Sequence, residues 1–207
     1  MNDFIFFFKQ GLSHISDLGA YDHILFITAL AAPYSIKNWK GLFFAVTMFT
    51  IGHSISLILA TLKLVSPNVS LIEFLIPVSI IATCLWNILS SKKSIDKEKN
   101  QMFHVEHQQS NYPIIILFGI IHGLGFSNYL RFILSESEHI FTPLLAFNIG
   151  LEIGQILILT IALLINFVLL ERTKISTHFR SIFISILIIL ISIPILLETG
   201  KAFFFEG

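Results

Sequence analysis

The sequence predicts an all-α, polytopic membrane protein with about six transmembrane helices in one bundle. Of the 207 residues, 55% are hydrophobic and only 13% are charged, whereas a soluble domain carries about 25% charged residues. The mean hydropathy is +0.82, and the apolar residues lie in long runs, as expected of membrane spans. The formal net charge is +0 and the chain has no basic stripe, so no nucleic-acid partner is expected.

A helix needs about 20 mostly apolar residues to cross a bilayer. Six runs approach this length, and the whole chain, residues 1–207, is therefore predicted to form a single transmembrane domain. The first run is short, and it is expected to span only if residues 11–20 also enter the bilayer. Residues 1–20 are otherwise expected to form an N-terminal interfacial segment held by phenylalanines. The six runs are Tyr21–Tyr34, Lys40–Leu64, Leu71–Leu89, Tyr112–Leu134, Pro143–Leu170 and Phe179–Leu197.

The distribution of lysine and arginine predicts the orientation. With six spans, the loops after the first, third and fifth helices share one side and carry most of the positive charge, from Lys37 and Lys40 to Arg172 and Lys174. The positive-inside rule places these loops in the cytoplasm. Both termini are therefore predicted to lie outside it, residues 90–111 to form a cytoplasmic loop, and the protein to be a multi-pass component of the cell inner membrane.

Five ionisable side chains lie at or inside the apolar runs. A charge at the bilayer centre costs about 2.5–3.5 kcal/mol on insertion scales, so such residues need a reason to be there. At 1.5 Å rise per residue, all five fall between the outer surface and the midplane in the predicted topology. Carboxylates and imidazoles at one depth indicate a cation path or a metal centre. The five are Asp22, His23, His53, His122 and Glu152.

The first two motifs each allow two interpretations. His14, Asp22 and His23 can bind a divalent first-row metal, or Asp22 can cap a helix while the histidines sit at the headgroup level. His53 either binds a ligand or donates a hydrogen bond to a neighbouring helix. Ser54 beside it either supports the site or bonds a carbonyl of its own helix.

The third motif places His122 between glycines and is followed by Ser127. Glycines there favour either a cavity around His122 or a close helix–helix contact. The fourth motif places Asn148, Glu152 and Gln155 on one helix face. Glu152 is expected to bind a cation, the alternative being a neutral, protonated Glu152 that bonds an asparagine or a histidine.

These motifs, in this order, resemble the HupE/UreJ family of small membrane proteins, and specifically its second branch. The resemblance implies a six-helix bundle and a role in the uptake of nickel or a related divalent metal, associated with hydrogenase and urease maturation. Nickel-transporting members have a histidine, five residues and then Asp-His, whereas seven residues separate His14 from Asp22 here. The matching segments are His14–Asp17, Tyr21–Phe26, Gly52–Ser54, His122–Phe126 and Phe147–Gln155.

The leading functional hypothesis is a membrane permease that takes up a divalent transition metal, with nickel or a related ion as its substrate and the lipid bilayer as its surroundings. The rival is an intramembrane zinc-dependent hydrolase in which Glu152 acts as the general base. A third possibility is an assembly factor whose buried polar residues only fix helix packing. The sequence favours a transporter over an enzyme and leaves the oligomeric state open. The expected metal ligands are His14, Asp22, His23, His53, His122 and Glu152, with Asn148, Gln155, Ser54 and Ser127 in support.

Overall fold

The structure, a computed structural model, describes residues 3–17, 19, 21–98, 111–134, 140–173 and 175–205. Within these ranges every regular element is helical, which confirms the all-α class. The elements are α1 (Asp3–Ser16), α2 (Asp22–Ala31), the 3₁₀ turn η1 (Ile36–Asn38), α3 (Trp39–Thr61), α4 (Val69–Glu98), α5 (Tyr112–Leu134), α6 (Phe141–Thr173) and α7 (Thr177–Phe205).

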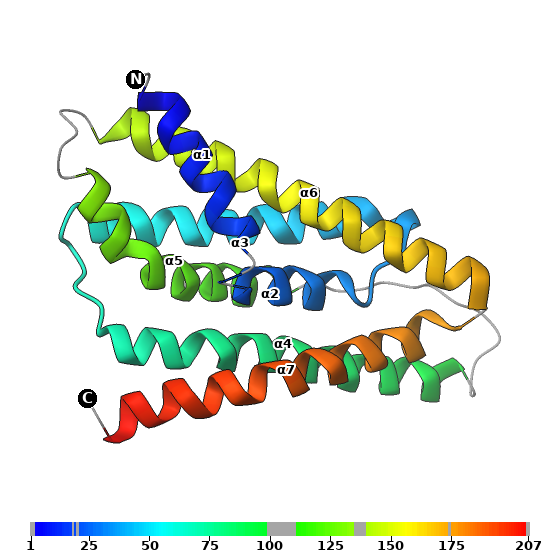
Figure 1. Cartoon of the computed structure of the whole chain (residues 1–207). Helices are drawn as coiled ribbons and strands as arrows, with labels where there is room; N and C mark the ends of the chain where they lie inside the picture. The colour runs from blue at the N-terminus through cyan, green and yellow to red at the C-terminus, as the bar shows by residue number, and fades with distance from the viewer. Residues whose placement is uncertain are drawn as a thin grey trace.

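The long helices lie side by side in one bundle, with α4 against α7, α3 against α5, and α1 crossing α6 obliquely (Figure 1). α1 begins and α7 finishes at the same end of this bundle. We call the opposite end, where α4 and α6 finish and α3 and α7 begin, the distal end. α1 ends and α2 begins inside the bundle, between its two ends (Figure 1).

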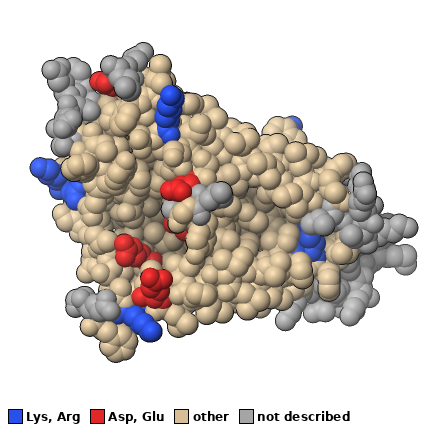
Figure 2. Space-filling view, in the orientation of Figure 1, with Lys and Arg blue, Asp and Glu red and all other residues tan. Residues whose placement is uncertain are grey.

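Five of the described helices are long and apolar enough to cross a membrane, namely α3, α4, α5, α6 and α7. The first predicted span, Tyr21–Tyr34, is not such a helix, because α2 has only 10 residues. α4 continues to Glu98, so residues 90–98 are helical rather than part of a loop, while residues 99–110 lie outside the described part. In Figure 2, Lys and Arg lie toward the ends of the molecule, Asp and Glu gather nearer the end that holds both termini, and most of the remaining surface is uncharged, as expected of a surface that faces lipid.

Polar side chains from three neighbouring helices hold the C-terminal end of α2. The last carbonyls of a helix have no partner within it, and an unpaired carbonyl in a membrane protein costs several kcal/mol. Three buried side chains donate to them: Asn87 of α4 to Ala29 at 2.8 Å, Asn166 of α6 to Ala31 at 3.4 Å, and Arg180 of α7 to Ala32 and Tyr34 at 3.2 and 2.8 Å. The cation of Arg180 also suits this negative end of the helix dipole.

Glycines bring two pairs of helices into backbone contact. A Cβ atom at Gly119 of α5 would collide with the carbonyl oxygen of Phe49 of α3, and one at Gly52 would collide with that of Ile116. In the α1–α6 pair, Gly11 and Gly150 fill the same role against the facing backbone. Small residues allow such close approach in membrane helices. The packing alternative for the glycines near His122 is therefore correct, and it places His53 and His122 on two helices in direct contact.

Candidate metal site

Five of the six expected ligands converge inside the bundle, contributed by four helices. His14 lies in the last turn of α1, Asp22 and His23 in the first turn of α2, His53 in the middle of α3, and His122 in the middle of α5. The ring centroid of His23 is 4.6 Å from that of His14, 5.7 Å from that of His53 and 5.1 Å from that of His122. We call these five residues the histidine cluster.

One subset of the cluster has the spacing of metal ligands. Ligand atoms of Asp22, His23 and His122 all lie within 4.8 Å of one another. His23 and His122 are almost fully buried, at 2% and 1% exposure, whereas the Asp22 side chain keeps 23% exposure. Asp22 therefore connects a closed interior to the surface.

The buried nitrogen and oxygen atoms of this cluster that could bind a metal have no hydrogen-bond partners. Buried polar groups in proteins are almost always hydrogen-bonded, and an unsatisfied one costs about 1–3 kcal/mol. Asp22 Oδ1 lies 3.4 Å from His23 Nδ1, and neither atom has a hydrogen-bond partner. Because imidazole nitrogens and carboxylate oxygens are metal ligands, such a set fits a bound divalent ion. The atoms are His14 Nε2, Asp22 Oδ1, His23 Nδ1 and Nε2, His53 Nδ1 and Nε2, and His122 Nδ1.

The alternative interpretation of Asp22 as a helix cap does not hold. Tyr21 occupies the N-cap position of α2 and makes no side-chain cap hydrogen bond, and Asp22 Oδ1 has no partner. The location still stabilises a carboxylate, because the N-terminus of a helix carries partial positive charge. α1 presents its opposite, negative end nearby, which favours a cation.

Ser79 of α4 sets the orientation of His122. The Ser79 hydroxyl donates to the Ile76 carbonyl at 2.7 Å, and its oxygen lies 3.0 Å from His122 Nε2. Because the hydroxyl hydrogen is already used, Ser79 accepts a hydrogen bond from Nε2–H. His122 Nδ1 then keeps its lone pair and remains free to bind a metal. A partner on the far nitrogen is the usual arrangement for metal-binding histidines.

Phenylalanines surround the cluster. Phe26 and Phe49 each lie 5.2 Å from the His122 ring, and Phe126 lies 3.8 Å from the His14 ring, measured between ring centroids. These apolar walls exclude water and lower the local dielectric, which strengthens the electrostatic attraction between an ion and Asp22.

Glu152 and its neighbours form a separate polar row between α3 and α6. The Thr47 hydroxyl donates to Glu152 Oε1 at 3.0 Å, the Thr50 hydroxyl donates to Gln155, and Ser54 donates to Asn148 Oδ1 at 2.7 Å. Ser54 also contacts the carbonyl of Thr50 at 2.8 Å. The row joins the two helices, and Glu152 bonds a threonine rather than an asparagine or a histidine. Among the expected supporting residues, Ser127 bonds its own helix, at Leu124 O.

Ser79, which contacts His122, was not predicted as a site residue. Ser79, Thr83 and Asn87 follow one another at four-residue spacing along α4, and all are buried. This spacing marks one helix face, and polar residues repeated on such a face of an apolar helix could have indicated it. The phenylalanine walls had no comparable signal, because phenylalanine is common throughout the chain.

Comparison with known proteins supports the resemblance. The sequence model described as HupE / UreJ protein matches residues 1–199. No curated protein matches the chain, and no solved structure does so. The match covers all five residues of the histidine cluster, four of the long apolar helices in full and α7 as far as residue 199. The chain therefore belongs to the HupE/UreJ family, and it is a multi-pass membrane protein of metal-transporter-like character.

Proposed function

We propose that the protein is a permease that takes up a divalent transition metal, nickel or a related ion, through the histidine cluster. The observation that supports this most directly is the convergence of unpartnered, buried nitrogen and oxygen atoms from four helices. His23, Asp22 and His122 form the centre of the proposed ion site, and His14 and His53 complete it from either side.

The composition of the cluster suits passage of an ion better than permanent retention. Its imidazoles are neutral when they bind metal, and Asp22 is its single carboxylate, so a bound divalent ion keeps a net charge of about +1. Incomplete neutralisation in an apolar environment is unfavourable. Such a site captures an ion without holding it indefinitely, as conduction requires.

The break between α1 and α2 also fits a transporter. Discontinuous membrane helices in transporters place helix ends at the substrate site. At 1.5 Å per residue, the 14 residues of α1 and the 10 of α2 span about 21 and 15 Å, and neither alone covers the hydrocarbon core of about 30 Å. We propose that together they make the first of six crossings, with both termini outside the cytoplasm and the chain in the cell inner membrane.

The intramembrane hydrolase has no comparable support. Such an enzyme needs a lateral opening to its metal site. An apolar groove of about 690 Å³ lies between α2, α6 and α7, and none of its lining residues belongs to the histidine cluster. Glu152, the expected general base, bonds Thr47 instead of the cluster.

The proposal can be tested by uptake of nickel, cobalt and zinc into proteoliposomes that contain a metal-sensitive dye. We expect the wild-type protein to admit at least one of the three ions, and His122→Gln to reduce uptake to the level of empty vesicles. His178→Gln is the matched control, since His178 lies in the first turn of α7 and is half-buried outside the cluster.

Equal uptake by His122→Gln and the wild-type protein would contradict the proposal, as would a wild-type protein that admits none of the three ions. Detergent-solubilised size-exclusion profiles of both variants show whether a loss of uptake reflects misfolding.

A further inference from the structure

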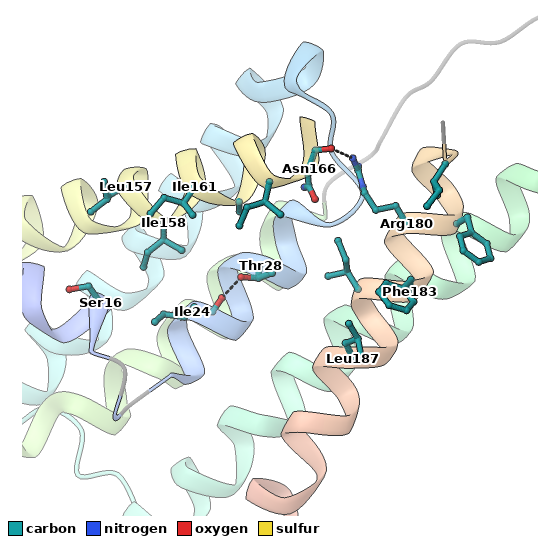
Figure 3. A pocket seen from close by; sticks show the side chains of 15 residues that line it. Ser16, Ile24, Thr28, Leu157, Ile158, Ile161, Asn166, Arg180, Phe183 and Leu187 are labelled. Atoms are coloured by element: carbon teal, nitrogen blue, oxygen red, sulfur yellow. Dashed lines mark hydrogen bonds between the residues drawn. The ribbon is translucent and has the colours of Figure 1, made fainter. Parts of the chain in front are cut away.

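Two cavities lie against α2 on opposite sides, and their walls differ in chemistry. The larger, of about 690 Å³, lies between α2, α6 and α7 and is mostly apolar (Figure 3). The smaller, of about 250 Å³, lies between the end of α2, α4 and the start of α5. The wall of the smaller cavity is also largely apolar, but Thr83 and Asn87 of α4, together with Asn111, add polar side chains to it.

A buried positive charge makes the larger cavity a poorer route for a cation than the smaller one. The buried guanidinium of Arg180 lines the larger cavity beside Asn166 (Figure 3). A fixed positive charge in an apolar wall repels a divalent ion strongly, because the low dielectric weakens screening. No lysine or arginine side chain lines the smaller cavity, and its polar side-chain atoms are hydroxyl and amide groups. Arg180 reaches this cavity only at the backbone carbonyl of Tyr34, to which it donates at 2.8 Å.

A row of polar side chains on α4 runs from the histidine cluster to the smaller cavity. Ser79 contacts His122 at 3.0 Å, and the Thr83 hydroxyl donates to the Ser79 carbonyl one turn further along α4, at 2.9 Å. Asn87 follows one more turn toward the distal end and donates to Ala29 O of α2. Its amide oxygen is then the acceptor that it can offer to a ligand. Polar side chains on successive turns of a membrane helix are costly and mark ion pathways.

We propose that this cavity, with Thr83 and Asn87 in its wall, is the vestibule through which a hydrated divalent cation leaves the histidine cluster toward the distal end. The inference rests on the proposed permease function and adds to it a route and a second set of oxygen ligands. Hard oxygen groups interact with the water shell of an ion and bind a transition metal less tightly than imidazole. An ion that reaches the vestibule is therefore released rather than trapped.

Cysteine accessibility tests the route. Cys84, the single cysteine, is first replaced by alanine. Thr83→Cys and Thr28→Cys are then made separately in that background. The two threonines are a matched pair, because each bonds a carbonyl four residues earlier in its own helix, at 2.9 and 2.7 Å, and each lines one of the two cavities. The probe is a quaternary-ammonium methanethiosulfonate, which is cationic and does not cross the membrane.

We expect Thr83→Cys to react with the probe applied from the distal side, at least tenfold faster than Thr28→Cys and faster than from the other side. The route is wrong if Thr83→Cys reacts no faster than Thr28→Cys, or if it reacts only with a membrane-permeant maleimide, which would identify a lipid-facing crevice. Nickel, cobalt and zinc uptake by the Cys84→Ala parent is measured in the same vesicles, so that a failed route is distinguished from a failed permease.

A second variant addresses the hydroxyl itself. Thr83→Val keeps the volume of the side chain and removes the polar group, and it lies outside the cluster. We expect uptake to slow by roughly tenfold, the effect of losing one hydrogen bond of about 1.4 kcal/mol, while the affinity of the purified protein for nickel, cobalt or zinc stays unchanged. Unchanged uptake by Thr83→Val would overturn the role assigned to this wall.

Discussion

The hydrogen bond between Ser79 and His122 gives the sharpest test of the metal site. Ser79→Ala removes the acceptor of His122 Nε2, at 3.0 Å in the structure. Ser79 is only 1% exposed, so bulk water does not replace the lost hydroxyl. A buried donor left without a partner costs about 1–3 kcal/mol. Loss of such an outer partner lowers metal affinity by about 10–100-fold, or about 1.4–2.7 kcal/mol, and the two estimates agree.

The affinity is measured on purified protein by competition of nickel, cobalt and zinc against a fluorescent chelator. Ser127→Ala is the matched control, because Ser127 is also 1% exposed and lies on the same helix as His122. Its hydroxyl bonds its own helix, at Leu124 O and 2.7 Å. We expect about a tenfold or greater loss of affinity for Ser79→Ala and none for Ser127→Ala. An unchanged affinity for Ser79→Ala, or an equal loss in both variants, refutes the assigned orientation of His122.

Three other changes have defined outcomes. Gly123→Ala would force a Cβ atom against the backbone of α3, whereas at Gly125 the Cβ atom meets only side-chain methyl groups. Gly123→Ala should therefore lower the free energy of unfolding, measured by thermal unfolding, by about 1–3 kcal/mol. Gly125→Ala should not. Glu152→Gln keeps an acceptor for Thr47, so metal affinity should stay unchanged, and a tenfold loss would place Glu152 in the site. Arg180→Met removes the donor to the carbonyl of Ala32 at the C-cap of α2, and should lower the melting temperature more than Arg180→Lys does.

The sequence predicted the histidine cluster because ionisable residues in apolar runs are costly and therefore conspicuous. Their common depth in the bilayer was predicted from helical rise together with the predicted topology. The sequence did not separate Glu152 from the cluster, because the direction in which a side chain points depends on helix rotation. That rotation depends on close glycine contacts such as the one between Gly119 and Phe49.

The break between α1 and α2 was equally hard to predict. The residues before Tyr21 contain no proline, and α2 is apolar after its first two residues apart from Thr28. Polar side chains from α4, α6 and α7 hold its C-terminal end, and these contacts join residues far apart in the chain. The sequence did not predict a role for Ser79, because a serine in a membrane helix can simply bond its own backbone.

The glycine contacts form two closely packed helix pairs, α3–α5 and α1–α6, and the histidine cluster is shared between these pairs and α2. His53 and His122 belong to the α3–α5 pair, His14 to the α1–α6 pair, and Asp22 with His23 to the short helix between them. A small slide of one pair past the other would alter how many ligands reach the ion at once, without any rotamer change. The number of ligands on the ion would then change together with the position of the helices. The distance between spin labels on α3 and α6 should therefore change when nickel is added.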